Sequence, residues 1–228
     1  MRLGIVFAGM IAAGSFSLAT TGMASEPIAN AELSTISVDA QTQIDAIENV
    51  LDVRRNTLLG KPIQPYTINT LAAQGVFEHA TVLWIPNPRR FYAIPADGKT
   101  WNMIDDTYNG TDEWVQMART KDRLSKFQSH GVPLEGYYPP FGGWALYLDR
   151  HPEEWSKYGW QQWHCSVHGS IYREYENGYV FGVYPINPTT RQGKVIILYK
   201  STQSVEFAEV PLPVGDCDAN ERLENFKE

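Results

Sequence analysis

The sequence predicts an α+β, β-rich fold of two units, each a helix followed by an antiparallel β-meander, with one disulfide. Three observations carry this prediction. Two helix-like segments, residues 39–59 and 111–129, are each followed by a Gly-x-Pro motif. Short runs of β-branched and aromatic residues, separated by turn signals, come after each helix. Cys165 and Cys217 are the two cysteines of the chain.

Residues 1–24 predict a secretory signal peptide. Arg2 supplies the positive start, residues 3–13 form an apolar run, and small residues lead to Ala24. The apolar run is shorter than the about 20 residues that a membrane-spanning helix needs. We therefore expect a periplasmic or secreted protein with no stable membrane span after cleavage, and residues 25–38 as a flexible lead.

The first unit is expected over residues 39–108. Asp39 can cap a helix that runs to about Leu59, where Gly60 and Pro62 stop it. Its apolar face at helical spacing consists of Ile44, Ile47, Leu51 and Leu58. Residues 63–75 are expected to form a loop. The meander that follows is expected over residues 81–85, 91–94 and 100–104, with Asp97-Gly98 as a hairpin turn.

The second unit is expected over residues 109–215. Thr111 is a suitable N-cap for its helix, and Gly131 ends it near Pro133. A short helix is expected over residues 152–158. The expected strands are 144–148, 170–175, 179–184, 194–199 and 205–210, with Asn177-Gly178 as a second hairpin turn. Residues 216–228 form a charged tail.

Composition excludes one class of partner. The net charge is −7, and basic residues gather only in the pairs Arg54-Arg55 and Arg89-Arg90. Nucleic-acid affinity comes from clustered Lys and Arg, so we expect no nucleic-acid partner. Aromatic residues make up 12% of the chain, which favours strands and aromatic-lined surfaces.

The cysteine pair predicts a disulfide. In an oxidising compartment, Cys165 and Cys217 are expected to form one structural bond, worth roughly 3–4 kcal/mol by loop entropy. The alternative is a metal site that combines Cys165 with His164 and His168. That spacing matches no standard zinc signature, so we expect neither a metal nor another cofactor.

The two halves also suggest an internal repeat. The segment 60–62 matches 131–133, because both read Gly-x-Pro. Two further matches pair residues 79–83 with 168–172 and residues 91–95 with 179–185. Chance similarity between short strands is the competing interpretation. Repeats of this kind are typical of binding modules rather than of enzymes.

Part of the first unit resembles a known family. The segments that carry the resemblance are Leu59-Gly60-Lys61-Pro62, Gln74-Gly75-Val76-Phe77, Val82-Leu83-Trp84-Ile85-Pro86 and Phe91-Tyr92-Ala93-Ile94. Together they resemble the LGFP-type repeat of exported bacterial proteins, over residues 59–101 and in part over 130–184. The resemblance implies association with the cell wall and a non-enzymatic role. It assigns no ligand-binding residue.

Catalytic motifs are sparse. His164 and His168 are four residues apart but lack the glutamate of a His-Glu-x-x-His site, and His79 could share a metal with His168 only across the repeat. Adjacent acids at a strand end, such as Asp105-Asp106, point to opposite sides and usually form a solvated turn rather than an acid–base pair. The chain has neither a Gly-x-Ser-x-Gly elbow nor a phosphate-binding loop, so no catalytic residue is assigned.

The aromatic residues supply the best binding candidates. We expect Trp84 and Trp101 in the core, because small meanders need bulky residues to bury enough area. Tyr137, Tyr138 and Phe141 lie in a proline-rich loop and are the predicted ligand-binding residues. The sequence therefore favours an exported, non-catalytic envelope or secreted module that binds a cell-wall glycan or an envelope protein. The alternative is a hydrolase of envelope polymers that uses carboxylates or a histidine-based metal site.

Overall fold

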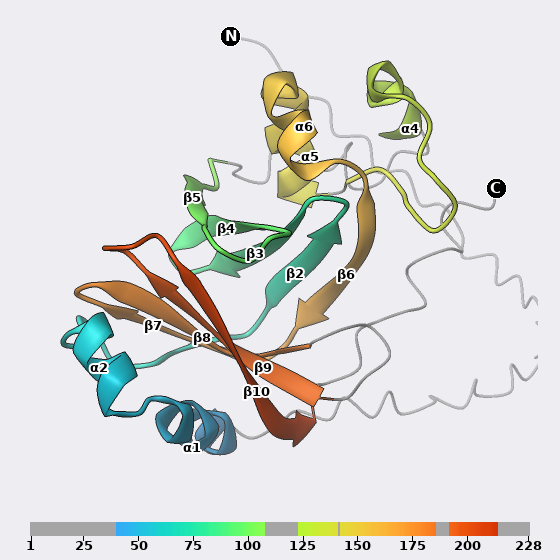
Figure 1. Ribbon diagram of the computed structural model, residues 1–228. Helices are drawn as coiled ribbons and strands as arrows, with labels where there is room; N and C mark the ends of the chain where they lie inside the picture. Colours follow the sequence, from blue (N-terminus) through green and yellow to red (C-terminus); the bar gives the residue numbers. More distant parts are fainter. Residues whose placement is uncertain (1–39, 108–122, 141, 186–191, 214–228) are drawn as a thin grey trace, which may run out of the picture. The chain divides into compact units, whose positions relative to one another are not determined.

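The computed structural model confirms the α+β, β-rich class and arranges the strands in two antiparallel sheets (Figure 1). It describes residues 40–107, 123–140, 142–185 and 192–213. These residues all belong to one compact unit, Thr35–Glu228. The predicted signal peptide, flexible lead, start of the second helix and charged tail lie outside the described residues. Within the described ranges, no helix is long and apolar enough to cross a membrane.

Sheet A has the strand order β1-β7-β8-β9-β10, and sheet B has the order β5-β4-β3-β2-β6. The strands of sheet A are β1 (Thr67–Asn69), β7 (Ser170–Tyr175), β8 (Gly178–Pro185), β9 (Gln192–Tyr199) and β10 (Val205–Pro213). Those of sheet B are β2 (Ala72–Phe77), β3 (Ala80–Pro86), β4 (Arg89–Pro95), β5 (Asn102–Asp105) and β6 (Gln161–Val167). Each sheet therefore takes four consecutive strands from one half of the chain and one edge strand from the other half.

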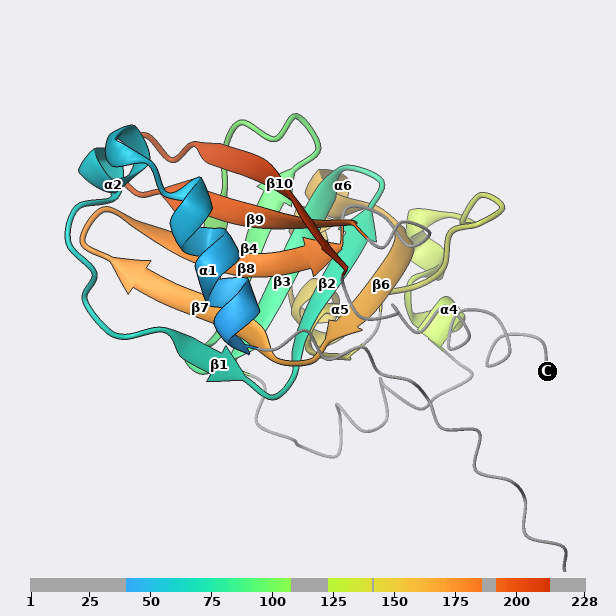
Figure 2. The same cartoon turned by 90° about the horizontal axis from the view of Figure 1, so that it is seen from below.

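Helices cover the outer faces of the two sheets. They are α1 (Ala40–Val50), α2 (Val53–Leu59), α4 (Arg123–Lys126), α5 (Gly142–Arg150) and α6 (Trp155–Tyr158), with short 3-10 turns η1 (Gln128–His130) and η2 (Pro152–Glu154). Helices α1 and α2 pack on sheet A, whereas α5 and α6 pack on sheet B (Figures 1 and 2). Helices α1 and α2 of the first half thus cover sheet A, which the second half mainly forms. Helices α5 and α6 of the second half cover sheet B, which the first half mainly forms.

Three apolar clusters hold these layers together. The cluster between the sheets combines side chains such as Leu83 and Tyr92 of sheet B with Phe181 and Leu198 of sheet A. A second cluster joins sheet B to α5 and α6, and a third joins sheet A to α1 and α2. As expected, Trp101 is buried, and Trp84 packs against the second cluster.

The predicted helix over residues 39–59 is wrong as a single element. The chain forms two helices, because Asp52 caps α2: its carboxylate accepts a hydrogen bond from the Arg55 N–H at 2.8 Å. Because the helix is interrupted at Asp52, α2 turns different residues toward the core than a continuous helix would. Leu59 is consequently fully buried, whereas Leu58 is 42% exposed.

Two further elements differ from the expected ones. Residues 144–148, expected as a strand, belong to helix α5, and the expected loop over 63–75 contains β1 and most of β2. A short apolar run suits a buried helix as well as a strand, so its periodicity does not distinguish them. Strand β2 contains Ala72, Gln74 and Gly75, which have low strand propensity, and pairing on both sides stabilises it.

The same hydrogen-bonded corner occurs twice. In the Glu176 corner, the Lys61 N–H donates to the Glu176 carboxylate at 3.1 Å, and the Glu176 N–H donates back to the Lys61 carbonyl at 2.9 Å. In the Glu78 corner, the Trp160 N–H donates to the Glu78 carboxylate at 2.9 Å, and the Glu78 N–H donates to the Trp160 carbonyl at 3.0 Å. Each corner joins the end of a helix to a hairpin of the opposite half.

The corners define which residues occupy equivalent places. Gly60 corresponds to Gly159, since both end a helix with positive φ, at 74° and 71°. Strands β2 to β5 correspond to β7 to β10, and β6 corresponds to β1. This correspondence differs from the one in the sequence comparison, which matched Gly60 with Gly131 and β3 with β7. Below, "counterpart" means the residue in the equivalent place.

Candidate functional site: a hollow between β5 and α5

A small hollow lies between the end of β5 and helix α5. Its polar lining consists of Asp105, Asp106, Thr107, Tyr147, Arg150 and His151. Its apolar lining consists of Phe91, Gly143 and Leu146. The interior volume of about 30 Å³ has room for a group of the size of one or two water molecules. Carboxylates, a guanidinium, an imidazole and a phenol thus meet around a space too small for an organic cofactor.

Asp106 is held firmly at one side of the hollow. Its side chain is only 2% exposed. The Trp84 indole N–H donates to Asp106 Oδ2 at 2.8 Å, and Arg89 Nη2 donates to the same oxygen at 3.0 Å. A buried carboxylate needs such donors, and here β3 and β4 supply them. The expectation of a solvated turn is wrong for Asp106, because Trp84 and Arg89 replace water around its oxygen.

Asp105 lies in the opposite environment. Its side chain is 74% exposed, and its Oδ1 accepts a hydrogen bond from Arg90 Nε at 3.2 Å. The two adjacent acids therefore differ, as expected at a strand end, although both line the hollow. Asp105 is available to solvent, whereas Asp106 is a fixed part of the wall.

Aromatic rings form the side of the hollow that helix α5 supplies. The Tyr147 ring stacks on Trp144 with centroids 4.9 Å apart, and the His151 ring lies 4.7 Å from Tyr147. Burial raises the pKa of Tyr147 above its ordinary value, and the charges of Glu154 and Glu153 raise it further. Its hydroxyl therefore remains a hydrogen-bond donor at neutral pH. Half of the His151 side chain is exposed, so this ladder of rings reaches the surface.

The corresponding face of sheet A carries helix α1. Gln43 and Ile47 of α1 are buried on sheet A, as Trp144 and Leu148 of α5 are buried on sheet B. Ile47 contacts Gly182 so closely that no Cβ would fit there. Tyr147, one residue before Leu148, is half-buried and borders the hollow.

One pair of counterparts differs in polarity. The counterpart of Asp106 is Val210, which lies opposite Gly193 on β9 and is 5% exposed. A fixed carboxylate on sheet B thus takes the place of an apolar side chain on sheet A.

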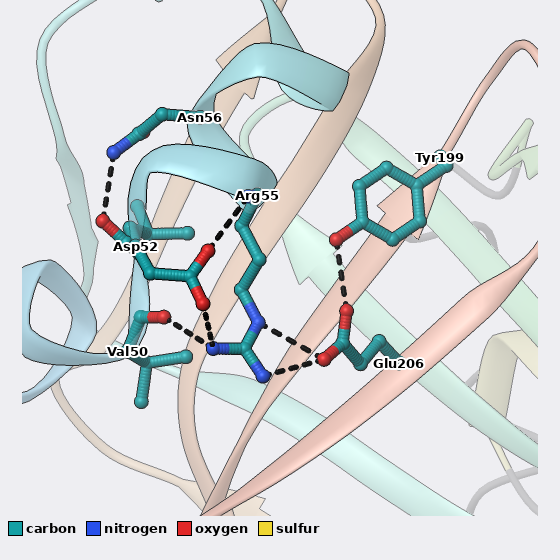
Figure 3. A network of polar contacts seen from close by, with 7 residues as sticks. Val50, Asp52, Arg55, Asn56, Tyr199 and Glu206 are labelled. Atoms are coloured by element: carbon teal, nitrogen blue, oxygen red, sulfur yellow. Dashed lines mark hydrogen bonds and ion pairs between the residues drawn. The ribbon is translucent and has the colours of Figure 1, made fainter.

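A second polar network belongs to sheet A. Arg55 Nε and Nη2 donate to Glu206 Oε1 at 2.9 and 2.5 Å, and the Tyr199 hydroxyl donates to Glu206 Oε2 at 2.9 Å (Figure 3). Arg55 also donates to the Val50 carbonyl and to Asp52. The hydrogen bonds from Arg55 lower the pKa of Glu206, and burial raises the pKa of Tyr199 to about 12. This network ties α2 to β10, so we interpret it as structural.

The structure places the predicted binding loop partly against the core. Tyr137 is half-buried and packs on the cluster beneath α5 and α6. Tyr138 forms a backbone bridge to Gln161, and its hydroxyl lies 3.2 Å from Nδ1 of the buried His164. Phe141 lies outside the described residues. The two tyrosines keep part of their surface exposed, and their role in binding stays a prediction.

The histidines are dispersed. His168 Nδ1 lies 3.2 Å from the Thr70 carbonyl, whereas His164 contacts Tyr138. Within the described ranges, no three His, Cys, Asp or Glu side chains gather as a metal site would require. Cys165 is buried in β6, but Cys217 lies outside these ranges, so the disulfide also stays a prediction.

Tyr147, Arg150 and His151 line the hollow but were not predicted as site residues. The reason is the wrong secondary structure for residues 144–148. On a strand, Tyr147 and His151 would lie about 13 Å apart, whereas on a helix they are neighbours one turn apart. The Tyr-x-x-x-His spacing was the available signal. Asp106 was predicted to lie in a solvated turn, and no pattern in the sequence indicates its burial.

Comparisons with known proteins find no relative: no family model, no curated protein and no solved structure matches the chain.

Proposed function

We propose that this protein is an exported, non-catalytic binding module of the cell envelope and that the hollow between β5 and α5 binds a glycan. The observation that carries the proposal is the lining of this hollow, in which the packed ring of Tyr147 meets the fixed carboxylate of Asp106 and other polar side chains. On sheet A the counterpart of Asp106 is the apolar Val210, so packing of such a sheet does not require the carboxylate.

The lining suits a sugar for two reasons. Sugars present both C–H faces, which pack on aromatic rings, and hydroxyls, which need donors and acceptors. Tyr147 and His151 supply ring surface, Asp105 supplies an acceptor, and the Thr107 hydroxyl can donate as well as accept. The rings of Trp144, Tyr147 and His151 pack on one another, so their side chains lose little conformational entropy when a ligand binds.

A titration of the secreted protein with cell-wall oligosaccharides, followed by calorimetry, tests this proposal. We expect Tyr147→Ala to weaken binding about tenfold or more, because it removes the stacking surface. Tyr66→Ala is a matched control, since Tyr66 is also half-buried but packs on the sheet A side. Equal affinities for both variants and the unchanged protein would contradict a glycan site at the hollow.

Export and the disulfide belong to the same proposal. The signal-peptide pattern of residues 1–24 supports export, and the resemblance to LGFP-type repeats supports association with the envelope. An oxidising compartment favours a bond between Cys165 and Cys217. Mass spectrometry of the exported protein without reductant should find a chain that begins after Ala24 and a peptide pair linked through these cysteines. Two free thiols would contradict the disulfide.

Hydrolysis is the second candidate function, because Asp105 and Asp106 line the same hollow. Against it, Asp106 Oδ2 already accepts hydrogen bonds from Trp84 and Arg89, which favours a fixed structural carboxylate over an acid–base catalyst. Incubation with envelope polymers should release no soluble fragments. Release that is lost in Asp105→Asn or Asp106→Asn would favour the hydrolase.

A further inference from the structure

We infer that the hollow selects glycans with free amino groups by binding a primary ammonium group, an inference that rests on the proposed glycan binding. Three features carry it: the unused hydrogen-bond acceptors of the lining, the size of the hollow, and the negative charge beside helix α5. The ligand class is therefore an amino sugar without an acetyl group on its nitrogen.

The unused hydrogen-bonding capacity of the lining is rich in acceptors. Oδ1 of Asp105 accepts a hydrogen bond from Arg90 at 3.2 Å, which leaves Oδ2 available on a side chain that is 74% exposed. Thr107 and Tyr147 also line the hollow, and their hydroxyls form no hydrogen bond within the described ranges. A primary ammonium group has three N–H donors and no acceptor, so it needs such oxygens.

The positive side chains around the hollow are engaged by other groups. Arg90 donates to Asp105, and Arg89 donates to Asp106 Oδ2 at 3.0 Å. Arg150 has an interaction partner of its own. An anionic ligand would therefore have to displace an existing partner, whereas a cationic ligand meets acceptors that are not in use.

The size of the hollow matches an ammonium group. The interior volume of about 30 Å³ admits a group of the size of a water molecule and excludes a sugar ring. An ammonium group is about as large as water, whereas an acetamido group is several times larger. Acetylation of the sugar nitrogen would thus remove its charge and also exceed the space. The sugar ring would lie outside the hollow, against Tyr147 and His151.

The side of the hollow beside α5 carries negative charge. Burial is the main reason why the pKa of Tyr147 is raised, and the charges of Glu154 and Glu153 raise it further. The field of these two carboxylates therefore reaches the lining. It favours a cation at the Tyr147 hydroxyl for the same reason that it disfavours ionisation of the phenol.

The test measures, by calorimetry, the affinity of the secreted protein for three matched tetrasaccharides: one of glucosamine, one of N-acetylglucosamine and one of glucose. We expect the glucosamine tetrasaccharide to bind about tenfold or more tightly than the other two, because a hydrogen bond between charged groups is worth about that factor. Asp105→Asn should remove most of this preference. Tyr147→Phe, which keeps the ring and removes the hydroxyl, should reduce it about threefold.

Glu209→Gln is the matched control. Glu209 of β10 is the counterpart of Asp105, is exposed, and does not line the hollow. The change removes one negative charge, as Asp105→Asn does, and should leave the preference for glucosamine unchanged. A lysine tetrapeptide, which carries ammonium groups without sugar rings, should bind at least about tenfold more weakly than the glucosamine tetrasaccharide.

The outcomes separate the two proposals. Equal binding of all three sugars, sensitive to Tyr147→Ala, would contradict the ammonium inference and leave the glycan site in place. Preference for N-acetylglucosamine, or a glucosamine preference that persists in both Asp105→Asn and Tyr147→Phe, would also contradict the inference. An equal loss in Glu209→Gln, or equally tight binding of the lysine tetrapeptide, would show that overall charge attracts the ligand instead. Binding of none of the sugars would contradict the glycan site itself.

Discussion

The outer faces of sheets A and B share one framework but carry different polar groups. Both faces receive a long helix and a short helix, and both short helices end in a corner held by a glutamate. On sheet A, Gln43 and Ile47 of α1 are buried, and the position of Val210 is apolar. On sheet B, Trp144 and Leu148 of α5 are buried, and Asp106, the counterpart of Val210, lines a hollow beside α5. The backbone hydrogen bonds specify the framework, so the side chains of the outer face are free to provide a site.

The faces also differ in how the short helix is attached. Arg55 ties α2 to Glu206 of β10 (Figure 3). The counterparts of these residues are Glu154 and Asn102, and Glu154 of η2 pairs instead with Lys157 of the adjacent α6. An ion pair from the short helix to an edge strand is therefore found on the sheet A side. The following predictions test both differences.

The glycine corners should give the largest effect. Gly159 has positive φ, and a Cβ there would collide with the Glu78 carboxylate, so Gly159→Ala should lower the free energy of unfolding by about 3 kcal/mol. At Gly60 the same Cβ would lie 2.8 Å from Glu176 Oε2, which predicts a smaller loss. Gly131 has positive φ but no neighbour within 4 Å, so Gly131→Ala should cost about 1–2 kcal/mol.

Denaturant unfolding of these three variants measures the order of their stability losses. Gly131→Ala is the matched control, since it adds backbone strain without a clash. If all three variants lost the same stability, the two corners would not be packed as tightly as their hydrogen bonds indicate.

Removal of the Asp106 carboxylate should give the second-largest loss of stability. Asp106→Ala leaves the indole N–H of Trp84 without its acceptor and should cost about 2 kcal/mol in denaturant unfolding. Val210→Ala, at the counterpart position, should cost a similar amount for a different reason, because it removes apolar contacts. Adding Trp84→Phe to Asp106→Ala should recover part of the loss, since no buried donor would then be left. Without such recovery, the indole bond would not be the source of the stability.

The Arg55–Glu206 pair predicts a dependence on pH. Its hydrogen bonds hold the pKa of Glu206 below the ordinary value of 4.5. A lowered folded pKa adds stability above the unfolded pKa, and that stability is lost as pH falls through the folded pKa. Both side chains are about a quarter exposed, so we expect about 1 kcal/mol.

Unfolding curves at neutral pH and below about pH 4.5 measure this loss, and Glu206→Gln should reduce it. Glu154→Gln, the matched change on the other face, should leave the curve nearly unchanged, since Glu154 pairs with Lys157 three residues away and ties no helix to a strand. An identical acid response in both variants would show that the link across elements adds nothing.

Asp105 should give the smallest effect on stability. Its side chain is 74% exposed, so Asp105→Asn should change the unfolding free energy by less than about 0.5 kcal/mol. The same change should weaken binding of cell-wall oligosaccharides, because the amide is a poorer acceptor than the carboxylate. A loss of stability without a loss of affinity would place Asp105 in the framework rather than in the site.

Local signals in the sequence determined several elements. Glycine and proline predicted where helices end, and Asp97-Gly98 and Asn177-Gly178 predicted two hairpins between strands that do pair. Such features depend on a few adjacent residues, whose backbone preferences are intrinsic. The α+β class and the burial of Trp101 also followed from composition and pattern.

Tertiary structure decided the features that depend on distant residues. Strands β1 and β6 each join the sheet of the other half, and no local pattern specifies a partner about 85 to 105 residues away. The apolar run at 144–148 became a helix because sheet B offered it an apolar face to cover. Asp106 became a buried wall of the hollow because Trp84 and Arg89 reach it from neighbouring strands. Solvation and burial of a carboxylate are properties of its surroundings, and those exist only once the sheets have formed.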